Sequence, residues 1–335
     1  MREEEKVSLR APEFPEGLEW MNSDPLTLEK LRGKVVLVDI WDYTCVNCIR
    51  ALPYVKEWNA RYGPEGLVVI GVHTPEFDFA KDSENVKAAV ERYGITYPVV
   101  LDNDYELWSL YANQYWPREY LIDTAGYIVY DHAGEGNYPQ TELFIQRYLE
   151  RAHRGARFPE PYKHSAAVES GDACYPSTQE VYCGHERGRM GSPEGYDEGE
   201  VVSYSDPGDY KDGYVYANGL WLNQSQSLRH ARKDPLKRDY IALKYHALSV
   251  NAVTAIAEGQ LPYKVFVTQD GQPVSPENRG SDLKEAGGET YFEVSGSRLY
   301  FLVRNAEFSS HTLKLTSESM EFDIYSFTFG SCKSK

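Results

Sequence analysis

Residues 34–48, Lys-Val-Val-Leu-Val-Asp-Ile-Trp-Asp-Tyr-Thr-Cys-Val-Asn-Cys, decide the fold of the first half of the chain. The stretch begins with apolar, mostly β-branched residues, which is typical of a short strand buried on both faces. A helical pattern then starts near Cys45 and continues to about Tyr62, with Pro53 inside it. We therefore expect a central strand that delivers Cys45 and Cys48 to the beginning of a helix.

This position gives the two cysteines different chemical roles. The unpaired N–H groups and the dipole of a helix N-terminus favour an anion, so they favour the thiolate form of Cys45, the nucleophile of disulfide exchange. Cys48 lies three residues further along the same helical face and can attack the resulting mixed disulfide. Asp39 interrupts the apolar strand, and burial raises the pKa of a carboxyl group. We predict Cys45, Cys48 and Asp39 as catalytic residues, with Asp39 accepting the proton of Cys48; a hydrogen-bonded structural acid is the alternative for Asp39.

A zinc site is another use of two cysteines separated by two residues. Such a site needs two further ligands at close spacing, whereas Cys174 and Cys183 belong to a distant part of the chain. We therefore expect no metal and no cofactor other than the redox-active disulfide of Cys45 and Cys48.

The chain divides into two regions that differ in their hydrophobic pattern and in the secondary structure it predicts. Up to about residue 155, apolar strands alternate with helical segments, which indicates an α/β sheet. Residues 156–177 are rich in Pro, Gly, Ser and charge, and we interpret them as a linker. Residues 178–335 contain short alternating runs separated by turn residues, which predicts an all-β jelly roll or β-sandwich.

Composition excludes some classes of function. The 335 residues carry a formal net charge of −16, which argues against nucleic acid as a partner. No apolar stretch is long enough to span a bilayer. The first six residues are polar and acidic, unlike a secretory leader. We expect the cytoplasm for the chain as written, or an extracytoplasmic, periplasmic location if a leader has been removed.

In the order and spacing of its motifs, the first region resembles the thioredoxin family. The matching residues are the strand 38–41, the Cys45/Cys48 pair, Pro53 and the dipeptide Trp116-Pro117. The resemblance implies a cis peptide bond at Pro117, and a substrate groove at which the backbone of Trp116 pairs with an extended peptide. Together with Trp41 and Thr44, these two residues are our predicted groove residues.

A closer resemblance is to the TlpA/DipZ-like branch of that family. Residues 31–38, 71–77 and 97–104 resemble its first strand and its insertion, and the resemblance implies an acid near the cysteines, for which Glu76 is the candidate. Three segments of the second region are similar to the carbohydrate-binding-module-like domain of DipZ proteins. They are 178–184, 219–221 and 325–330. The membrane-embedded domain of DipZ proteins has no counterpart in this sequence, and Val46-Asn47 replaces the Gly-Pro of ordinary thioredoxins.

The second region leaves two questions open. A carbohydrate ligand is one hypothesis, because aromatic side chains can stack on sugars, but strand aromatics are more often core residues. The candidates are Tyr214, Tyr216, Trp221 and Tyr245. Cys174 and Cys183 flank a short polar loop and are candidates for a structural disulfide, which would favour an oxidising compartment. Cys332 is then expected to be a free thiol.

We predict a thiol–disulfide oxidoreductase that reduces, oxidises or exchanges disulfides in protein substrates, with an upstream thiol electron donor or acceptor. A thiol peroxidase is one alternative. A peroxidase signature would place a Thr and a Cys three residues apart after a proline, whereas Thr44 directly precedes Cys45 here, and the nearby Cys48 suits dithiol exchange better. The other alternative is a non-catalytic module that binds a glycan or a protein partner on a thioredoxin scaffold. The direction of electron transfer stays open at this point.

Overall fold

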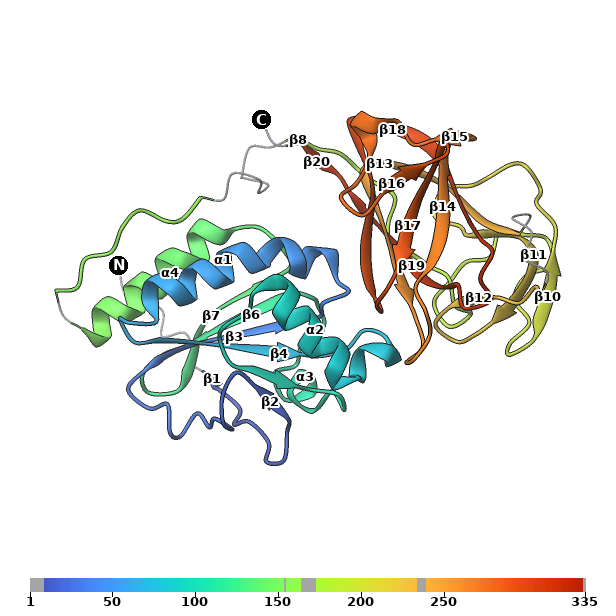
Figure 1. Cartoon of the computed structure of the whole chain (residues 1–335). Coiled ribbons are helices and arrows are strands. Elements are labelled where there is room, and N and C mark those ends of the chain that lie inside the picture. Colours follow the sequence, from blue (N-terminus) through green and yellow to red (C-terminus); the bar gives the residue numbers. More distant parts are fainter. Residues whose placement is uncertain (1–8, 154, 164–172, 234–238, 334–335) are drawn as a thin grey trace. The chain divides into compact units, whose positions relative to one another are not determined.

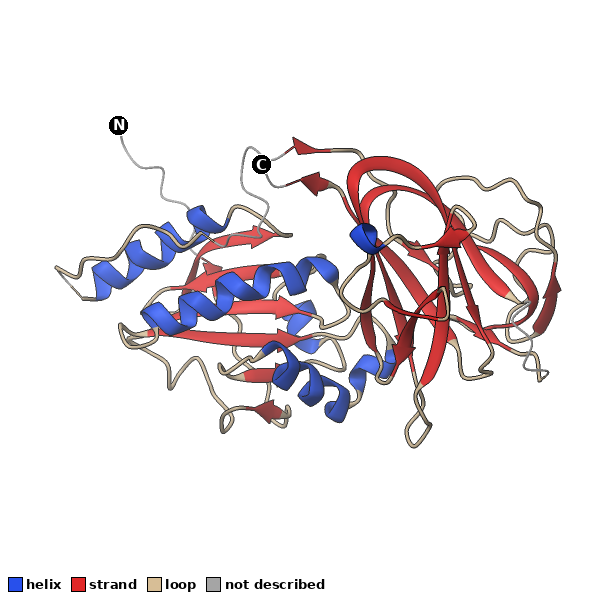
Figure 2. Cartoon of the chain, turned by 45° about the horizontal axis from the view of Figure 1, so that its top comes forward, coloured by secondary structure: helices blue, strands red, loops and turns tan. Residues whose placement is uncertain are grey.

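In the computed structural model, residues 9–153, 155–163, 173–233 and 239–333 are described (Figure 1). The chain forms two compact units, Met1–Gly171 and Asp172–Lys335. Helices accompany the sheet of the first unit, whereas the described part of the second unit consists of strands joined by loops, with one short 3₁₀ turn (Figure 2).

The first unit is built on a seven-stranded mixed sheet in the order β1-β7-β6-β3-β4-β5-β2. Strands β3, β4 and β5 are parallel, and the other neighbours are antiparallel. The strands are β1 (Leu9–Arg10), β2 (Trp20–Met21), β3 (Val35–Trp41), β4 (Leu67–His73), β5 (Val99–Leu101), β6 (Arg118–Ile122) and β7 (Tyr127–Ala133). The helices are α1 (Val46–Tyr62), α2 (Ser83–Tyr93), α3 (Glu106–Leu110) and α4 (Tyr138–Ala152), with a 3₁₀ turn η1 (Asp78–Lys81).

Strand β3 lies at the centre of this sheet and is buried along its whole length. Successive side chains of a strand point to opposite faces. Accordingly, Val36, Val38 and Ile40 enter one core cluster, and Leu37 and Trp41 enter the other, which also contains residues of α1 and α4. Asp39 follows the alternation of Leu37 and Trp41, so its carboxyl group lies on the face covered by α1 and α4.

The main strands and helices predicted for the first region are confirmed, within a residue or two at their ends. The short strands β1 and β2 were missed, because two-residue strands carry no periodic signal.

The end of the first unit differs from the predicted domain boundary at residue 155. The ring of Phe158 packs edge-on against Tyr62, and the backbone N–H of Tyr162 donates to the carboxylate of Glu142. Residues 158–162 therefore pack on α1 and α4 as part of the first unit. Of the predicted linker 156–177, residues 164–172 lie outside the described part of the chain.

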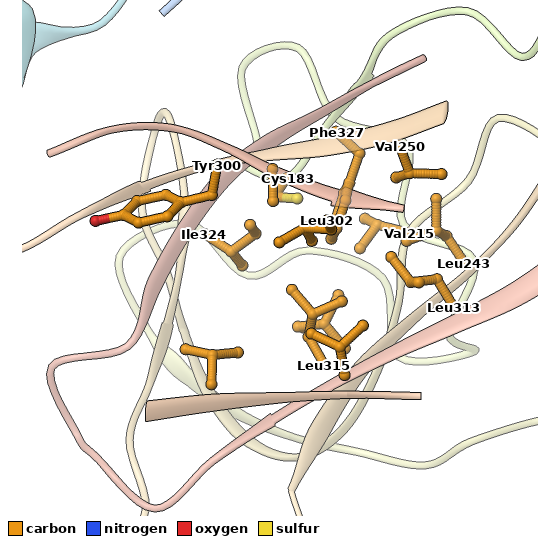
Figure 3. Close-up of a cluster of buried hydrophobic side chains, with 14 of the residues drawn as sticks. Cys183, Val215, Leu243, Val250, Tyr300, Leu302, Leu313, Leu315, Ile324 and Phe327 are labelled. Carbon is orange, nitrogen blue, oxygen red and sulfur yellow. The ribbon is translucent and has the colours of Figure 1, made fainter. Parts of the chain in front are cut away.

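The second unit is an all-antiparallel β domain, which confirms the predicted class. One hydrogen-bonded network of eleven strands surrounds a single large hydrophobic cluster, part of which is drawn in Figure 3. Strand β13 runs through its middle and pairs with β11, β18 and β19. The strands are β9 (Val181–Tyr182), β10 (Val201–Tyr204), β11 (Tyr216–Asn223), β12 (Leu228–His230), β13 (Tyr240–Ala255), β14 (Tyr263–Gln269), β15 (Gln272–Pro273), β16 (Lys284–Ala286), β17 (Glu289–Val294), β18 (Arg298–Ser317) and β19 (Asp323–Gly330), with a 3₁₀ turn η2 (Pro276–Asn278). A separate two-stranded ladder pairs β8 (Ala173–Cys174) with β20 (Cys332–Lys333).

Most of the aromatic residues proposed as sugar platforms belong to the core. Trp221 and Tyr245 are fully buried, and Tyr216 is 3% exposed. A buried ring offers no face to a sugar in solution, so the stacking role is wrong for these three residues. Tyr214 is half-buried, and for it the hypothesis stays open.

The cysteine predictions for the second unit are also wrong. Cys183 is a free thiol, fully buried in the core of the domain, where it lies among Leu302, Ile324 and Phe327 (Figure 3). Cys332, expected to be free, is disulfide-bonded. In the backbone ladder of β8 and β20, position 332 lies directly opposite position 174. Because Cys183 is free, it does not close the loop 175–182 through a disulfide, as the prediction assumed.

Candidate active site

Cys45 is the N-cap residue of α1. Its backbone is extended, and the N–H of Cys48 donates to its Sγ at 3.4 Å. The side chain is half-buried, so the sulfur is accessible while it also faces the positive end of the helix. The accessible sulfur lies where the predicted attacking residue is needed, and the role of Cys45 as the nucleophile stays a prediction.

Cys48 lies beneath it and is 1% exposed. Burial, together with the hydrogen bond and the negative charge of Cys45, raises the pKa of the Cys48 thiol well above its ordinary value. The backbone of Asp42 opposes this shift, and the charge of Asp39 adds to it. Because the protonated form of Cys48 is favoured, this thiol needs a base before it can attack a disulfide.

Asp39 supplies a carboxyl group in the same buried region. Burial raises its pKa from 3.8 to about 7, and its Oδ1 accepts no hydrogen bond from the described residues. A carboxylate with a pKa near 7 can accept a proton and release it again at neutral pH. The structure therefore places Asp39 where the predicted base is needed, and its catalytic role stays a prediction.

The loop between β3 and α1 is organised by Asp42, which sequence reasoning missed. Its fully buried Oδ1 accepts from the N–H of Thr44 at 2.7 Å and from the hydroxyl of Thr44 at 3.0 Å, and its Oδ2 accepts from the N–H of Glu76. These bonds hold the turn that leads into Cys45. The pattern Asp-x-Thr before a helix is an Asx-turn signal, which would have identified Asp42.

Two predicted groove residues lie below the surface. Trp41 is fully buried in the cluster that contains Cys48, and Thr44 is 1% exposed. Neither can line an open groove, so this part of the prediction is wrong. Trp41 instead packs in the core, and Thr44 donates to Asp42 in the turn before Cys45.

The predicted cis peptide bond between Trp116 and Pro117 is confirmed. The indole N–H of Trp116 donates to the carbonyl oxygen of Thr74 at 3.0 Å, and its ring packs on Trp108 with centroids 4.2 Å apart. Trp116 is half-buried and packs against the same hydrophobic cluster as Cys45. Its position beside the thiol pair and its contact with substrate stay predictions.

The remaining predicted acid, Glu76, lies next to this loop. Its backbone N–H donates to Asp42, and its side chain is half-buried. His73, three residues earlier at the end of β4, is fully buried. Its ring stacks on Tyr43, and its Nε2 lies 3.7 Å from Asp42 Oδ1. Glu76 thus lies beside the turn before Cys45, and its role near the cysteines stays a prediction.

A second buried acid, Glu119 on β6, was also missed. It is the direct cross-strand neighbour of Asp39, and its Oε2 accepts from the Thr141 hydroxyl at 3.0 Å. Burial and the charge of Asp39 raise the pKa of Glu119 to about 8. The sequence shows Glu119 in an alternating hairpin strand, but only the register between β3 and β6 places it beside Asp39.

The described residues contain neither a candidate metal site nor a candidate membrane-spanning helix. No three His, Cys, Asp or Glu side chains there converge on a position where they could hold a metal ion. No helix in that part of the chain has the length and apolar character needed to cross a bilayer.

Family models match both units of the chain. A model described as Redoxin matches residues 6–143, and one described as a thioredoxin-like C-terminal domain matches residues 178–330. Together they account for the two units that the structure separates.

Individual relatives agree with this division. The chain is 35% identical over 324 residues to Protein DipZ of Mycobacterium bovis, which covers 96% of this chain and 43% of that protein. This chain thus spans less than half the length of that relative. Thiol-disulfide oxidoreductase YkuV of Bacillus subtilis is 30% identical over 145 residues, 43% of this chain and 97% of that protein. NHL repeat-containing protein 2 of Homo sapiens is 38% identical over 150 residues, 43% of this chain and 21% of that protein.

Proposed function

Because this chain belongs to the thioredoxin-like redoxin family and carries the two-unit arrangement that it shares with DipZ, we propose that it is a thiol–disulfide oxidoreductase acting on protein disulfides. The observation that supports this most directly is the asymmetry of the two thiols. Cys45 is accessible and receives an N–H at the helix terminus, whereas Cys48 is buried with a raised pKa beside a carboxyl group of pKa about 7.

The proposed cycle follows from this asymmetry. The Cys45 thiolate attacks a substrate disulfide, forms a mixed disulfide with one substrate sulfur and releases the other as a thiolate. Cys48 then loses its proton to the Asp39 carboxylate and attacks Cys45. The Cys45–Cys48 bond forms, the bond to the substrate breaks, and the second substrate sulfur leaves as a thiolate. Two electrons pass from the protein dithiol to the substrate, and an external thiol donor restores the dithiol.

Partner recognition belongs to the same proposal. A disulfide in a protein has to approach Cys45 as an extended segment, and Trp116 with Pro117 is the pair expected to align it by strand-like pairing. Among the described large apolar side chains, Tyr115 is 53% exposed directly before this pair. An exposed aromatic residue at this point supports a protein substrate rather than a small hydrophilic one.

The test compares two oxidising substrates, insulin disulfides and hydrogen peroxide, and uses one variant that should trap the mixed disulfide. The reduced protein should reduce insulin disulfides with repeated turnover in dithiothreitol and should turn over hydrogen peroxide at least about tenfold more slowly, because Cys48 is arranged to resolve a mixed disulfide. The Cys48→Ser variant should accumulate a mixed disulfide with a protein substrate, detected on a non-reducing gel. A Cys183→Ser variant serves as the matched control, since Cys183 is a buried thiol in the other unit. Faster peroxide turnover than insulin reduction, or the absence of any trapped disulfide, would refute the proposal.

A further inference from the structure

Asp39 has only one side-chain neighbour across the sheet. Strand β3 lies between β4 and β6, and the register places Gly71 on one side of Asp39 and Glu119 on the other. Gly71 has no side chain, and a Cβ there would lie 3.0 Å from Trp41 Nε1 and 3.1 Å from the ring of Tyr97. Glu119 is therefore the residue of the sheet that shares the α1 and α4 face directly with Asp39.

The surroundings of the two carboxyl groups contain hydroxyls and a thiol. Cys48 faces them from α1, Tyr97 from the segment before β5, Tyr130 and His132 from β7, and Tyr138 and Thr141 from α4. In the described part of the chain, burial acts on Asp39, and burial, the charge of Asp39 and the Thr141 hydroxyl act on Glu119; no lysine or arginine is among these influences. Two adjacent carboxylates without a cation strongly resist double ionisation.

The two groups therefore titrate as a pair rather than singly. Burial raises the pKa of Asp39 to about 7, and burial with the charge of Asp39 raises that of Glu119 to about 8. Near neutral pH the pair holds between one and two protons. A pair in this state can take up a proton from Cys48 and still remain close to electrical neutrality.

A chain of hydrogen bonds leads from Glu119 away from the buried site. The Thr141 hydroxyl donates to Glu119 Oε2 at 3.0 Å, and the Tyr130 hydroxyl lies 3.2 Å from the Thr141 oxygen. Tyr130 is half-buried on β7, the strand next to β6. Thr141 can donate only one proton, and since it donates to Glu119, Tyr130 donates to Thr141. With Glu119 ionised, this order of donors carries a proton toward Glu119. Once Glu119 is protonated, both hydroxyls turn so that Glu119 donates to Thr141 and Thr141 donates to Tyr130, and the same chain then leads a proton toward the surface of the unit.

We propose that Glu119 is a positioning residue for proton transfer. It shares the proton that Asp39 takes from Cys48, and it passes this proton to the Thr141–Tyr130 chain. The inference rests on the proposed thiol–disulfide exchange. In the resolving step the Cys48 proton moves to the Asp39–Glu119 pair, the Cys48 sulfur bonds to Cys45, and the substrate sulfur leaves with the electron pair of the broken bond. The pair returns its proton to solvent before the next turnover.

The experiment follows single-turnover oxidation of the reduced full-length protein by a disulfide peptide between pH 5 and pH 10. The wild-type rate should rise in two steps, because the pair loses two protons in sequence. The rate of the Glu119→Gln variant should rise with pH in one step instead of two, and its plateau above pH 8 should be about fivefold below the wild-type rate. Asp39→Asn should retain a weaker step due to Glu119, and the double variant should lose both. A purely structural role of Glu119 would lower stability without removing a step.

Two further variants keep the test decisive. Glu142→Gln makes the same chemical change at another buried glutamate of this unit, and its pH profile should match the wild type. Thr141→Val removes the hydroxyl that lowers the pKa of Glu119, so it should move the upper step to higher pH without removing it. This variant decides the question if Glu119→Gln does not fold.

An infrared measurement reads the carboxyl groups without relying on rates. The reduced-minus-oxidised difference spectrum should contain the carbonyl band of a protonated carboxyl group, and Glu119→Gln should weaken that band. Identical pH profiles and identical bands in the wild type and Glu119→Gln, or an unshifted profile in Thr141→Val, would overturn this inference while the exchange activity stands. If the wild-type protein itself oxidises no faster than its Cys45→Ser variant, the proposed function fails instead.

Discussion

Glu142 and Asp39 are both buried acids of the first unit, and their surroundings are opposite in character. Glu142 on α4 is fully buried and accepts hydrogen bonds from Trp58 Nε1 at 3.0 Å, from the Tyr62 hydroxyl at 2.5 Å and from the Tyr162 N–H at 2.7 Å, with Arg61 at 3.5 Å. Asp39 is equally buried, and its Oδ1 lacks a hydrogen-bond donor within the described structure.

The difference separates a structural acid from a reactive one. Hydrogen-bond donors and a guanidinium group surround both carboxyl oxygens of Glu142, and these contacts tie residues of α1 to α4 and to the segment after α4. Asp39 and Glu119 have few donors, so neither the charged nor the neutral form is strongly preferred near neutral pH. Burial alone therefore does not mark a proton-transfer residue; burial without hydrogen-bond donors does.

The largest expected effect is on rate. Asp39→Asn should slow the resolution of the mixed disulfide about 100-fold at pH 7, because the buried Cys48 loses its proton acceptor. Resolution is measured as release of a labelled peptide from a preformed Cys45 mixed disulfide. Glu142→Gln is the control, with a change of less than about twofold. Equal slowing in both variants would remove the distinction between the two sites.

The next effect is on stability. Glu142→Gln should lower the free energy of unfolding by about 2 kcal/mol, because an amide N–H₂ then faces groups that are themselves donors. Asp39→Asn should cost little at pH 6, where the Asp39 carboxyl is mostly protonated and the amide replaces a neutral group. Urea unfolding of both variants at pH 6 measures the contrast. A larger loss for Asp39→Asn than for Glu142→Gln would contradict it.

The smallest effect is the pH dependence of that stability. The pKa of Asp39 is about 7 in the folded protein and near 4 in the unfolded chain. Between pH 4 and pH 7 the folded protein therefore holds a proton on Asp39 that the unfolded chain has lost. Stability from Asp39 is therefore complete below about pH 4 and is lost as pH rises through 7. Between pH 6 and pH 8 the loss from this group is about 1.4 kcal/mol.

Asp39→Asn should lack this loss, so its stability relative to the wild type should rise by about 1.4 kcal/mol over the same interval. The same urea titrations at pH 6, 7 and 8 provide the measurement. Glu142→Gln should remain parallel to the wild type across these pH values. A constant difference between Asp39→Asn and the wild type would show that Asp39 does not titrate there.

Local sequence patterns were sufficient for most of the fold of the first unit. The apolar strand 35–41, the helix that follows it and the hairpin around Gly126 each have a short-range signal, and the structure contains all of them. The all-β character of the second unit was equally predictable from alternating runs. Two predictions failed there because they depend on which strands lie beside one another: Cys332 is disulfide-bonded rather than free, and Trp221 is buried.

The candidate site divides in the same manner. Cys45, Cys48 and Asp39 were found from their positions relative to one strand and one helix, and the cis bond at Pro117 from a resemblance. Glu119 is 80 residues away from Asp39 in the chain, and only the β3–β6 register brings them together. The compartment stays a prediction, and the reducing direction with its external thiol donor is a proposal.

By itself, the sequence determined that two thiols stand at the start of a helix behind a buried strand, because periodicity and helix-terminus chemistry act over a few residues. The tertiary structure alone decided which groups surround those thiols. Pairing across a sheet joins residues without regard to their separation in the chain, and burial depends on every element packed above. A pair of neighbouring acids without a cation is a property of that packing, and no local pattern records it.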